Sequence, residues 1–291
     1  MKSIASEANP RYRAWLRLAE SPRQIRLSGR TLAEGIHVIE AARAAAHPIE
    51  ALLVRRGAQG QAVERLAAQL AHEGVACYEL SPALFDRLSP VERGAGLIAV
   101  IAVTHTPEPR DLAADALYLD GVQDPGNVGA LLRVAAAAGV RHVLAGPGTA
   151  ALWAPKVVRA AQGAHFALAL YDVADPAHLK QALRGPWFGA DAHAATSLWE
   201  VALPSAPIGW IFGAEGRGLS AAARAVCDAY VTIPMASAVE SLNVASAAAV
   251  CLFERRRRLL SANGGRVHPL GEGGAFGKNA PSQSDGGDDV G

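Results

Sequence analysis

The sequence predicts an α/β protein in which a mostly parallel sheet follows a smaller α/β module. Between residues 111 and 261, short apolar stretches alternate with alanine-rich helical stretches, and this alternation requires parallel strands covered by helices on both faces. Residues 1–105 repeat the alternation on a smaller scale. A segment with two prolines, 104–110, separates the two parts and is typical of a linker.

The first domain is expected at residues 1–105. Its predicted strands and helices follow from short β-branched runs and from apolar positions at helical spacing. The strands are 49–55, 75–80 and 97–103, and the helices are 31–46, 61–73 and 81–88.

The second domain is expected at residues 106–261. Strands are predicted at 117–119, 142–145, 167–171, 187–190, 208–212 and 230–233, and helices at 131–138, 154–162, 177–183, 221–227 and 242–260. Residues 262–291 are glycine-rich and carry too little apolar surface to fold alone, so a disordered tail is predicted. Arg255 to Arg258 close the preceding helix, where four cations suit the negative end of its dipole better than a contact with a charged partner.

Composition excludes several classes of protein. No apolar run approaches the roughly 20 residues that span a bilayer, and the N-terminus lacks the apolar region of a signal peptide. The three cysteines, Cys77, Cys227 and Cys251, lie far apart without metal-ligand spacing. We therefore expect a cytoplasmic protein with neither a membrane partner nor a metal site.

Charge is distributed unevenly although the net charge is only +1. The first 30 residues contain seven Lys or Arg, including Arg26 and Arg30, against two Glu. Residues 125–171 contain no Asp or Glu but keep Arg133 and Arg141. Either run is open to two interpretations: a solvated cationic face, or a surface that faces phosphates.

Three strand-to-helix junctions present polar side chains. In the first, strand 116–119 runs into Asp-Pro-Gly, and Asn127 is placed to cap a helix that Gly139 ends and that carries Arg133. In the second, strand 209–212 enters the glycine-rich loop Gly213-Ala-Glu-Gly-Arg-Gly218 around Glu215, and Ser220 caps the next helix. In the third, strand 230–233 leads through Pro234 and small residues to Ser241-Leu242-Asn243, which opens an apolar helix. Groups at such helix starts can reach a ligand.

In order and spacing, these three motifs resemble those of the SpoU (TrmH-type) RNA 2′-O-ribose methyltransferases of the SPOUT superfamily. Residues 155–166 resemble the helix that links the motifs in this family, and residues 29–39 resemble the opening of its L30e-like RNA-binding domain. One position departs from the pattern: Ser237 stands where the family usually has glycine, which leaves the shape of the third loop open.

The resemblance implies a SPOUT-type parallel sheet with a C-terminal trefoil knot, and S-adenosylmethionine as methyl donor. It places Gly213, Ile233 and Leu242 in the cofactor pocket, with Met235 as a further contact. No metal is needed for the reaction.

The resemblance gives Arg133 the central catalytic role, either as base or as phosphate clamp. A guanidinium with a pKa above ~12 is a poor base, so the clamp is the easier role, and a phosphate oxygen or water would then take the proton. Asn127, Ser241 and Asn243 are expected to hold hydroxyl and phosphate groups, and Glu215 to orient Arg133 or the loops. Helix capping by Asn127 and Ser241, and an exposed loop acid at Glu215, are the structural alternatives.

The expected substrate is RNA, contacted by Arg26, Arg30, Arg133 and Arg141. Ribosomal RNA is favoured over transfer RNA because of the basic N-terminal segment, and neither the RNA nor the nucleotide is identified. A non-catalytic, ribosome-associated RNA-binding protein is the alternative. A dinucleotide-binding dehydrogenase is disfavoured, because the acid-free run of 125–171 lacks the carboxylate that would hold a ribose.

A homodimer is expected through the last helix. Leu242, Ala245, Ala249 and Leu252 form one apolar stripe, and further small apolar residues lie around the rest of the helix. Such a helix needs cover on more than one side, which the core of one chain and a symmetry mate would provide.

Overall fold

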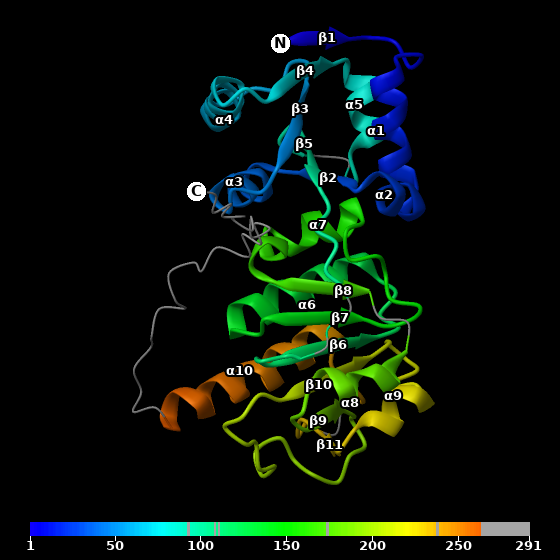
Figure 1. Ribbon diagram of the computed structural model, residues 1–291, viewed down its shortest axis with the longest axis vertical. Helices are drawn as coiled ribbons and strands as arrows, with labels where there is room; N and C mark the ends of the chain where they lie inside the picture. Colours follow the sequence, from blue (N-terminus) through cyan, green and yellow to red (C-terminus); the bar gives the residue numbers. More distant parts are fainter. Residues whose placement is uncertain (92–93, 108, 110, 173–174, 237–238, 263–291) are drawn as a thin grey trace, which may run out of the picture.

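The computed structural model describes residues 1–91, 94–107, 109, 111–172, 175–236 and 239–262. It contains two sheets, one from each half of the chain, which lie one above the other along the long axis of the molecule (Figure 1). The predicted tail, apart from Ala262, and Ser237 fall outside the described residues.

The N-terminal sheet has five strands in the order β1-β4-β3-β5-β2. Strand β5 runs antiparallel to its neighbours β3 and β2, and the other pairs are parallel. The strands are β1 Lys2–Ile4, β2 Arg30–Glu34, β3 Ile49–Arg55, β4 Ala76–Leu80 and β5 Leu97–Ala102, and the helices are α1 Pro10–Glu20, α2 Pro22–Ser28, α3 Ile36–Ala44, α4 Gln61–His72 and α5 Pro82–Leu88.

The predicted helix at residues 31–46 is wrong in its first part. Residues 30–34 form strand β2, which pairs with β5 and buries Leu32 and Ala33, so sheet pairing overrides the local helix propensity. Helix α3 begins only after Gly35, whose φ of 111° suits glycine. Helices α1 and α2 were not predicted, although both carry start signals: Asn9 and Ser21 cap them, and each has proline at its beginning.

The C-terminal sheet has six strands in the order β11-β9-β10-β6-β7-β8, and every pairing in it is parallel. This confirms the predicted parallel sheet. The strands are β6 Ala116–Asp120, β7 His142–Ala145, β8 Ala169–Asp172, β9 Trp187–Ala190, β10 Gly209–Gly213 and β11 Ala229–Val231. The helices are α6 Pro125–Ala138, α7 Pro155–Ala161, α8 Leu179–Ala182, α9 Ala221–Val226 and α10 Val244–Ala262, with 3-10 turns η1 Ala164–Ala167 and η2 Pro176–His178.

Most elements of the second domain agree with the prediction to within two residues, and two differ by more. Helix α6 starts at Pro125 and not at 131, because Asp124 caps it. The predicted helix 177–183 is split into η2 and α8. Strand β11 ends at Val231, and Thr232 forms only an isolated bridge with Ser197.

The two sheets share one continuous core. At the junction, Thr31 Oγ1 on β2 donates a hydrogen bond of 2.7 Å to the carbonyl of Trp153, and the ring of His47 stacks on Trp153 at 6.0 Å. A Cβ at Gly163 would lie 2.5 Å from Ala41, so η1 approaches α3 closely. The domains are therefore held at a fixed distance by packing as well as by the chain that links them.

Helix α10 packs against α6 and against β10. Figure 1 shows it in orange, running beside α6 behind the strands. Val244, Ala245, Ala248 and Leu252 are buried, whereas Phe253 is 47% exposed. The trefoil knot stays a prediction, because strand order and pairing do not define how the chain is threaded. None of the described helices is both long and apolar enough to cross a membrane.

Candidate active site

The three motifs meet at one edge of the C-terminal sheet. They follow β6, which ends at Asp120, β10, which ends at Gly213, and β11, which ends at Val231. Because the strands are parallel, the carboxyl ends lie on the same side, where ligands of open α/β sheets bind. Segments about 90 and 30 residues apart in the sequence are thereby brought together.

A triangle of side chains forms at this edge. Asn127 Nδ2 donates to Glu215 Oε1 at 2.7 Å, and Asn243 Nδ2 donates to the same oxygen at 3.0 Å and to Asn127 Oδ1 at 2.9 Å. Each member comes from a different motif. We call Asn127, Glu215 and Asn243 the polar triangle. Asn127 is half-buried, and the other two are exposed, so the triangle lies at the surface where a ligand can reach it.

Neither Asn127 nor Ser241 caps one of the described helices, although capping was the structural alternative to a catalytic role for both. Asp124 caps α6, and its Oδ1 accepts from the N–H of Asn127 at 2.8 Å. The Asn127 side chain is therefore free to point at Glu215. Asn243 Oδ1 accepts from the N–H groups of Ala245 at 2.9 Å and Ser246 at 3.2 Å, so Asn243 is the residue that caps α10. This cap fixes the amide and aims its nitrogen at the polar triangle.

The second motif is a tight glycine loop that carries Glu215. The N–H of Gly218 bonds to the carbonyl of Ala214 at 2.9 Å, and Gly216 and Gly218 have φ of +77° and +63°. A Cβ at Gly213 would lie 2.2 Å from the Gly218 carbonyl oxygen. The sequence of glycines is thus required for the loop to close, and the closed loop holds Glu215 outward.

Asp120 is a residue of this site that the sequence analysis missed. It ends β6 and is only 7% exposed, and its carboxylate accepts from the N–H of Ser220 at 2.6 Å and from the Ser220 hydroxyl at 3.1 Å. Ser220 in turn caps α9, as predicted. Asp120 therefore ties the end of the glycine loop to the first motif. An acid that ends a fully apolar strand is the signal that would have identified it.

Arg133 and Ser241 do not join the polar triangle. Arg133 is exposed on α6, and six helical residues place it about 9 Å along the axis from Asn127 and about 120° around it. It makes no ion pair or hydrogen bond within the described part of the chain. Ser241 is likewise exposed and has no hydrogen-bond partner among the described residues. Both side chains remain available to an external ligand.

The residues predicted to bind the cofactor lie around the same edge. Gly213 ends β10, and Ile233 and Met235 follow β11 and are half-buried, while Leu242 is 38% exposed. In the part of the chain that the structure describes, Ile233, Met235 and Leu242 make no hydrogen bond with any group. Free backbone groups beside apolar side chains suit a purine, whose ring packs on the side chains while its edge bonds to the backbone.

The other predicted cations have different surroundings. Arg30 forms an ion pair of 2.6 Å with Glu50. Arg26 and Arg141 are exposed and make no ion pair with the described residues. In the part of the chain that the structure describes, no group of three or more His, Cys, Asp or Glu side chains is placed to hold a metal ion.

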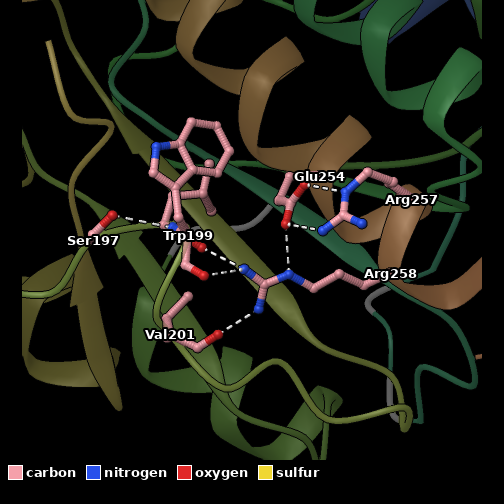
Figure 2. A network of polar contacts seen from close by, with 7 residues as sticks. Ser197, Trp199, Val201, Glu254, Arg257 and Arg258 are labelled. Carbon is pink, nitrogen blue, oxygen red and sulfur yellow. Dashed lines mark hydrogen bonds and ion pairs between the residues drawn. The ribbon is translucent and has the colours of Figure 1, made fainter. Parts of the chain in front are cut away.

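The interpretation of Arg255 to Arg258 as a helix terminus is wrong. Helix α10 continues to Ala262, so these residues lie inside it. Arg255 is 3% exposed and bonds to Asp115, and Arg258 bonds to the carbonyls of Leu198, Trp199 and Val201 (Figure 2). The arginines hold other parts of the chain, which a sequence pattern alone does not show.

Comparisons with known proteins identify the family of this chain. Residues 115–253 match the model of the SpoU rRNA methylase family, and residues 9–99 match that of the MRM3-like substrate binding domain. The chain is 31% identical over 259 residues to the 23S rRNA (guanosine(2553)-2′-O)-methyltransferase RlmP of Bacillus subtilis, covering 88% of this chain and all of that protein.

Two solved structures share the fold. A crystal structure of an RNA 2′-O ribose methyltransferase has a TM-score of 0.72 and 33% identity, covering 88% of this chain and 98% of that one. The SpoU methyltransferase AviRb from Streptomyces viridochromogenes, in complex with the cofactor AdoMet, has a TM-score of 0.76 and 25% identity, covering 87% and 99%.

The fold and the site thus define the class: an S-adenosylmethionine-dependent RNA 2′-O-methyltransferase. The chain belongs to the SpoU rRNA methylase family.

Proposed function

We propose that this enzyme methylates a ribose 2′-hydroxyl of large-subunit ribosomal RNA. The polar triangle carries the proposal, because it joins all three motifs at the edge where free backbone groups are also found. The relatives support the substrate, since RlmP of Bacillus subtilis is named for 23S rRNA.

We assign the cofactor to the loops after β10 and β11. The backbone of Gly213, Ile233 and Met235 would bond to the adenine, and the side chains of Ile233 and Leu242 would pack on it. S-adenosylmethionine, when bound, supplies an electrophilic methyl group on a sulfonium. The protein's task is to orient the hydroxyl in line with that methyl group.

The polar triangle is proposed to lock the three loops in one geometry. Glu215 Oε1 already accepts two hydrogen bonds, which leaves Oε2 as an acceptor for the substrate. Because the amide nitrogens of Asn127 and Asn243 both donate to Glu215 Oε1, the carboxylate is held in place. Ser241 is exposed and lies two residues before Asn243, and its hydroxyl is proposed to bond to the RNA.

Arg133 is proposed to clamp the phosphate next to the target ribose. Its exposure and lack of a described partner support this role, since a planar guanidinium can bind two phosphate oxygens at once. The proton of the hydroxyl would leave to a phosphate oxygen or to water. Arg26, Arg30 and Arg141 are proposed to contact the RNA outside the reaction centre.

We propose a homodimer in which α10 takes part in the interface. Leu242, two residues before α10, and Phe253, in the middle of this helix, are 38% and 47% exposed in a single chain, and a second copy would cover them. Light scattering at micromolar concentration measures this directly, and a mass near that of one chain, 30.2 kDa, would contradict it.

We also propose that the domains meet near residue 105 and that the second domain ends near residue 261. A cytoplasmic location is proposed from the sequence alone.

The decisive experiment maps ribose methylation in 23S and transfer RNA from a strain that lacks the gene. Mass spectrometry should show one 2′-O-methylated nucleotide lost from 23S rRNA and restored by the wild-type gene, but not by a gene carrying Glu215→Ala. An unchanged 23S rRNA with a change in transfer RNA would replace the proposed substrate. No change in either would contradict the proposed function.

A further inference from the structure

The segment 191–208, which joins β9 to β10, is held in place by arginines of α10. We call it the β9–β10 loop. Arg255 donates from Nε to Asp115 Oδ2 at 3.0 Å and from Nη2 to the carbonyl of Ala206 at 2.8 Å, and it also bonds to the carbonyl of Pro204. Its side chain is 4% exposed. The second half of the loop is thereby fixed to the helix.

Arg258 holds the first half of the same loop. Its Nη2 donates to the carbonyls of Leu198 at 2.6 Å and Trp199 at 3.2 Å, and its Nη1 bonds to the carbonyl of Val201. Figure 2 shows the Arg258 guanidinium pointing from α10 into the loop, with the Glu254 carboxylate between Arg257 and Arg258. Glu254 Oε1 accepts from Arg258 Nε at 2.7 Å, which fixes the plane of the guanidinium. One side chain thus satisfies three loop carbonyls.

The clamped residues are bonded directly to the third motif. The N–H of Leu198, whose carbonyl Arg258 holds, donates to the carbonyl of Thr232 at 2.8 Å. The N–H of Thr232 donates to the carbonyl of Thr196 at 2.9 Å, and its hydroxyl donates to the carbonyl of Ala192 at 3.1 Å. Thr232 immediately precedes Ile233. Strand β11 has already ended at Val231, so this bridge positions the chain that enters residues 233–236.

We infer that Arg258 is a positioning residue for the cofactor. It acts through residues 196–201 and Thr232 on Ile233 and Met235, which are assigned to the cofactor pocket. The inference rests on the proposed cofactor site. It requires an arginine, because Arg258 donates from Nη1 and Nη2 to the loop carbonyls while its Nε bonds to Glu254, whereas a lysine donates from a single nitrogen.

Arg257 is a matched control one residue away. It also bonds to Glu254, at 2.7 and 2.8 Å, but its side chain is 64% exposed and makes no hydrogen bond or ion pair with the described residues of the β9–β10 loop. Arg257→Ala and Arg258→Ala therefore remove the same charge from the same helix and leave Glu254 one partner each. Only Arg258→Ala releases the loop.

The test compares Arg258→Ala, Arg258→Lys and Arg257→Ala in the full-length protein. Calorimetric titration with S-adenosylmethionine should give a dissociation constant raised about tenfold for both Arg258 variants and changed less than twofold for Arg257→Ala. Hydrogen exchange at the amides of Leu198 and Thr232 should quicken in the Arg258 variants only. In steady-state assays the KM for S-adenosylmethionine should rise more than kcat falls, a pattern that a general loss of folded protein does not produce.

Equal cofactor affinity in Arg258→Ala and Arg257→Ala would overturn the inference. So would faster exchange at Leu198 and Thr232 without any change in affinity, because the loop would then be clamped with no effect on the pocket. If Arg258→Ala fails to fold, Arg258→Lys, which keeps the charge beside Glu254, serves for the same comparison. A wild-type chain that binds no S-adenosylmethionine would instead contradict the proposed function.

Discussion

The two sheets of this protein differ in where their strands end. In the N-terminal sheet, β5 runs antiparallel to its neighbours, so the carboxyl ends of the strands lie at both edges. In the C-terminal sheet, all the paired strands run the same way, and the loops after β6, β10 and β11 gather at one edge. The polar triangle exists only at the second kind of edge. Strand direction, more than composition, decides which α/β layer collects polar groups.

The two regions also treat their cations differently. In the N-terminal domain many arginines are neutralised: Arg30 by Glu50, Arg43 by Glu73, Arg55 by Asp86 and Arg56 by Glu79. The stretch 125–171 contains no Asp or Glu that could pair with Arg133 or Arg141. Arg133 and Arg141 make no ion pair with the described residues, whereas Arg159 of the same stretch lies 3.7 Å from Glu34 of the other domain. Four experiments test what the two regions contribute.

The largest effect is expected for Arg133→Ala. Methylation should fall at least about 100-fold, because the phosphate clamp would be lost from the transition state. The affinity for S-adenosylmethionine should stay within a few-fold, since Arg133 lies on α6 and not on the loops after β10 and β11 that are assigned to the cofactor. Single-turnover assays and calorimetric titration measure the two quantities. Arg133→Lys should also be poor. Loss of cofactor binding in a folded variant would contradict the assignment.

Asn243→Asp separates capping from the polar triangle. An aspartate keeps the oxygen that caps α10 but cannot donate to Glu215 and Asn127, and it places a second negative charge beside Glu215. We expect methylation to fall about 10- to 100-fold with little loss of stability, whereas Asn243→Ala should in addition lower the free energy of unfolding by about 1 kcal/mol. Chemical denaturation and activity assays distinguish the two. Full activity of Asn243→Asp would show that the triangle is not needed.

The N-terminal domain is tested by removing arginines of α1 and α2 that make no ion pair with the described residues. The triple variant Arg13→Ala, Arg23→Ala, Arg26→Ala should weaken RNA binding about tenfold, and the salt dependence should fall because fewer counterions are released. Cofactor affinity should not change. Arg65→Ala on α4, which lies on the opposite side of the N-terminal sheet in Figure 1, is the control. If the triple variant binds RNA as the wild type does, this domain does not read the substrate through these helices.

The smallest effect concerns the junction between the two domains. His165 is buried there, and burial lowers its pKa from the ordinary 6.5 to about 4. The unfolded chain therefore takes up a proton between these pH values that the folded chain does not, so stability falls as the pH drops below 6.5. The free energy of unfolding should decrease by about 1 kcal/mol from pH 7 to pH 5.5 through this group. Denaturation of His165→Gln should show a shallower decrease. An identical pH dependence would exclude His165 as its source.

Much of the site was accessible from the sequence. The order of the motifs identified Asn127, Glu215 and Asn243, because strand ends followed by glycine, proline and amide residues are local signals. Helix starts were less well predicted. The cap of α6 was placed at Asn127, but Asp124 takes it, and the cap of α10 is Asn243 and not Ser241. Several residues near a helix start can cap it, and local sequence does not choose among them.

The sequence by itself determined the alternation of strands and helices, the parallel sheet and the three motifs. These depend on periodicity and turn chemistry, which act over a few residues. The tertiary structure decided the rest: that residues 30–34 join a sheet, that Asp120 holds Ser220, and that Arg255 and Arg258 bind the β9–β10 loop. Each of these depends on partners some 50 to 100 residues away. A charged side chain in a helix looks the same in the sequence whether it faces water or a buried row of carbonyls, because only packing determines which of them it meets.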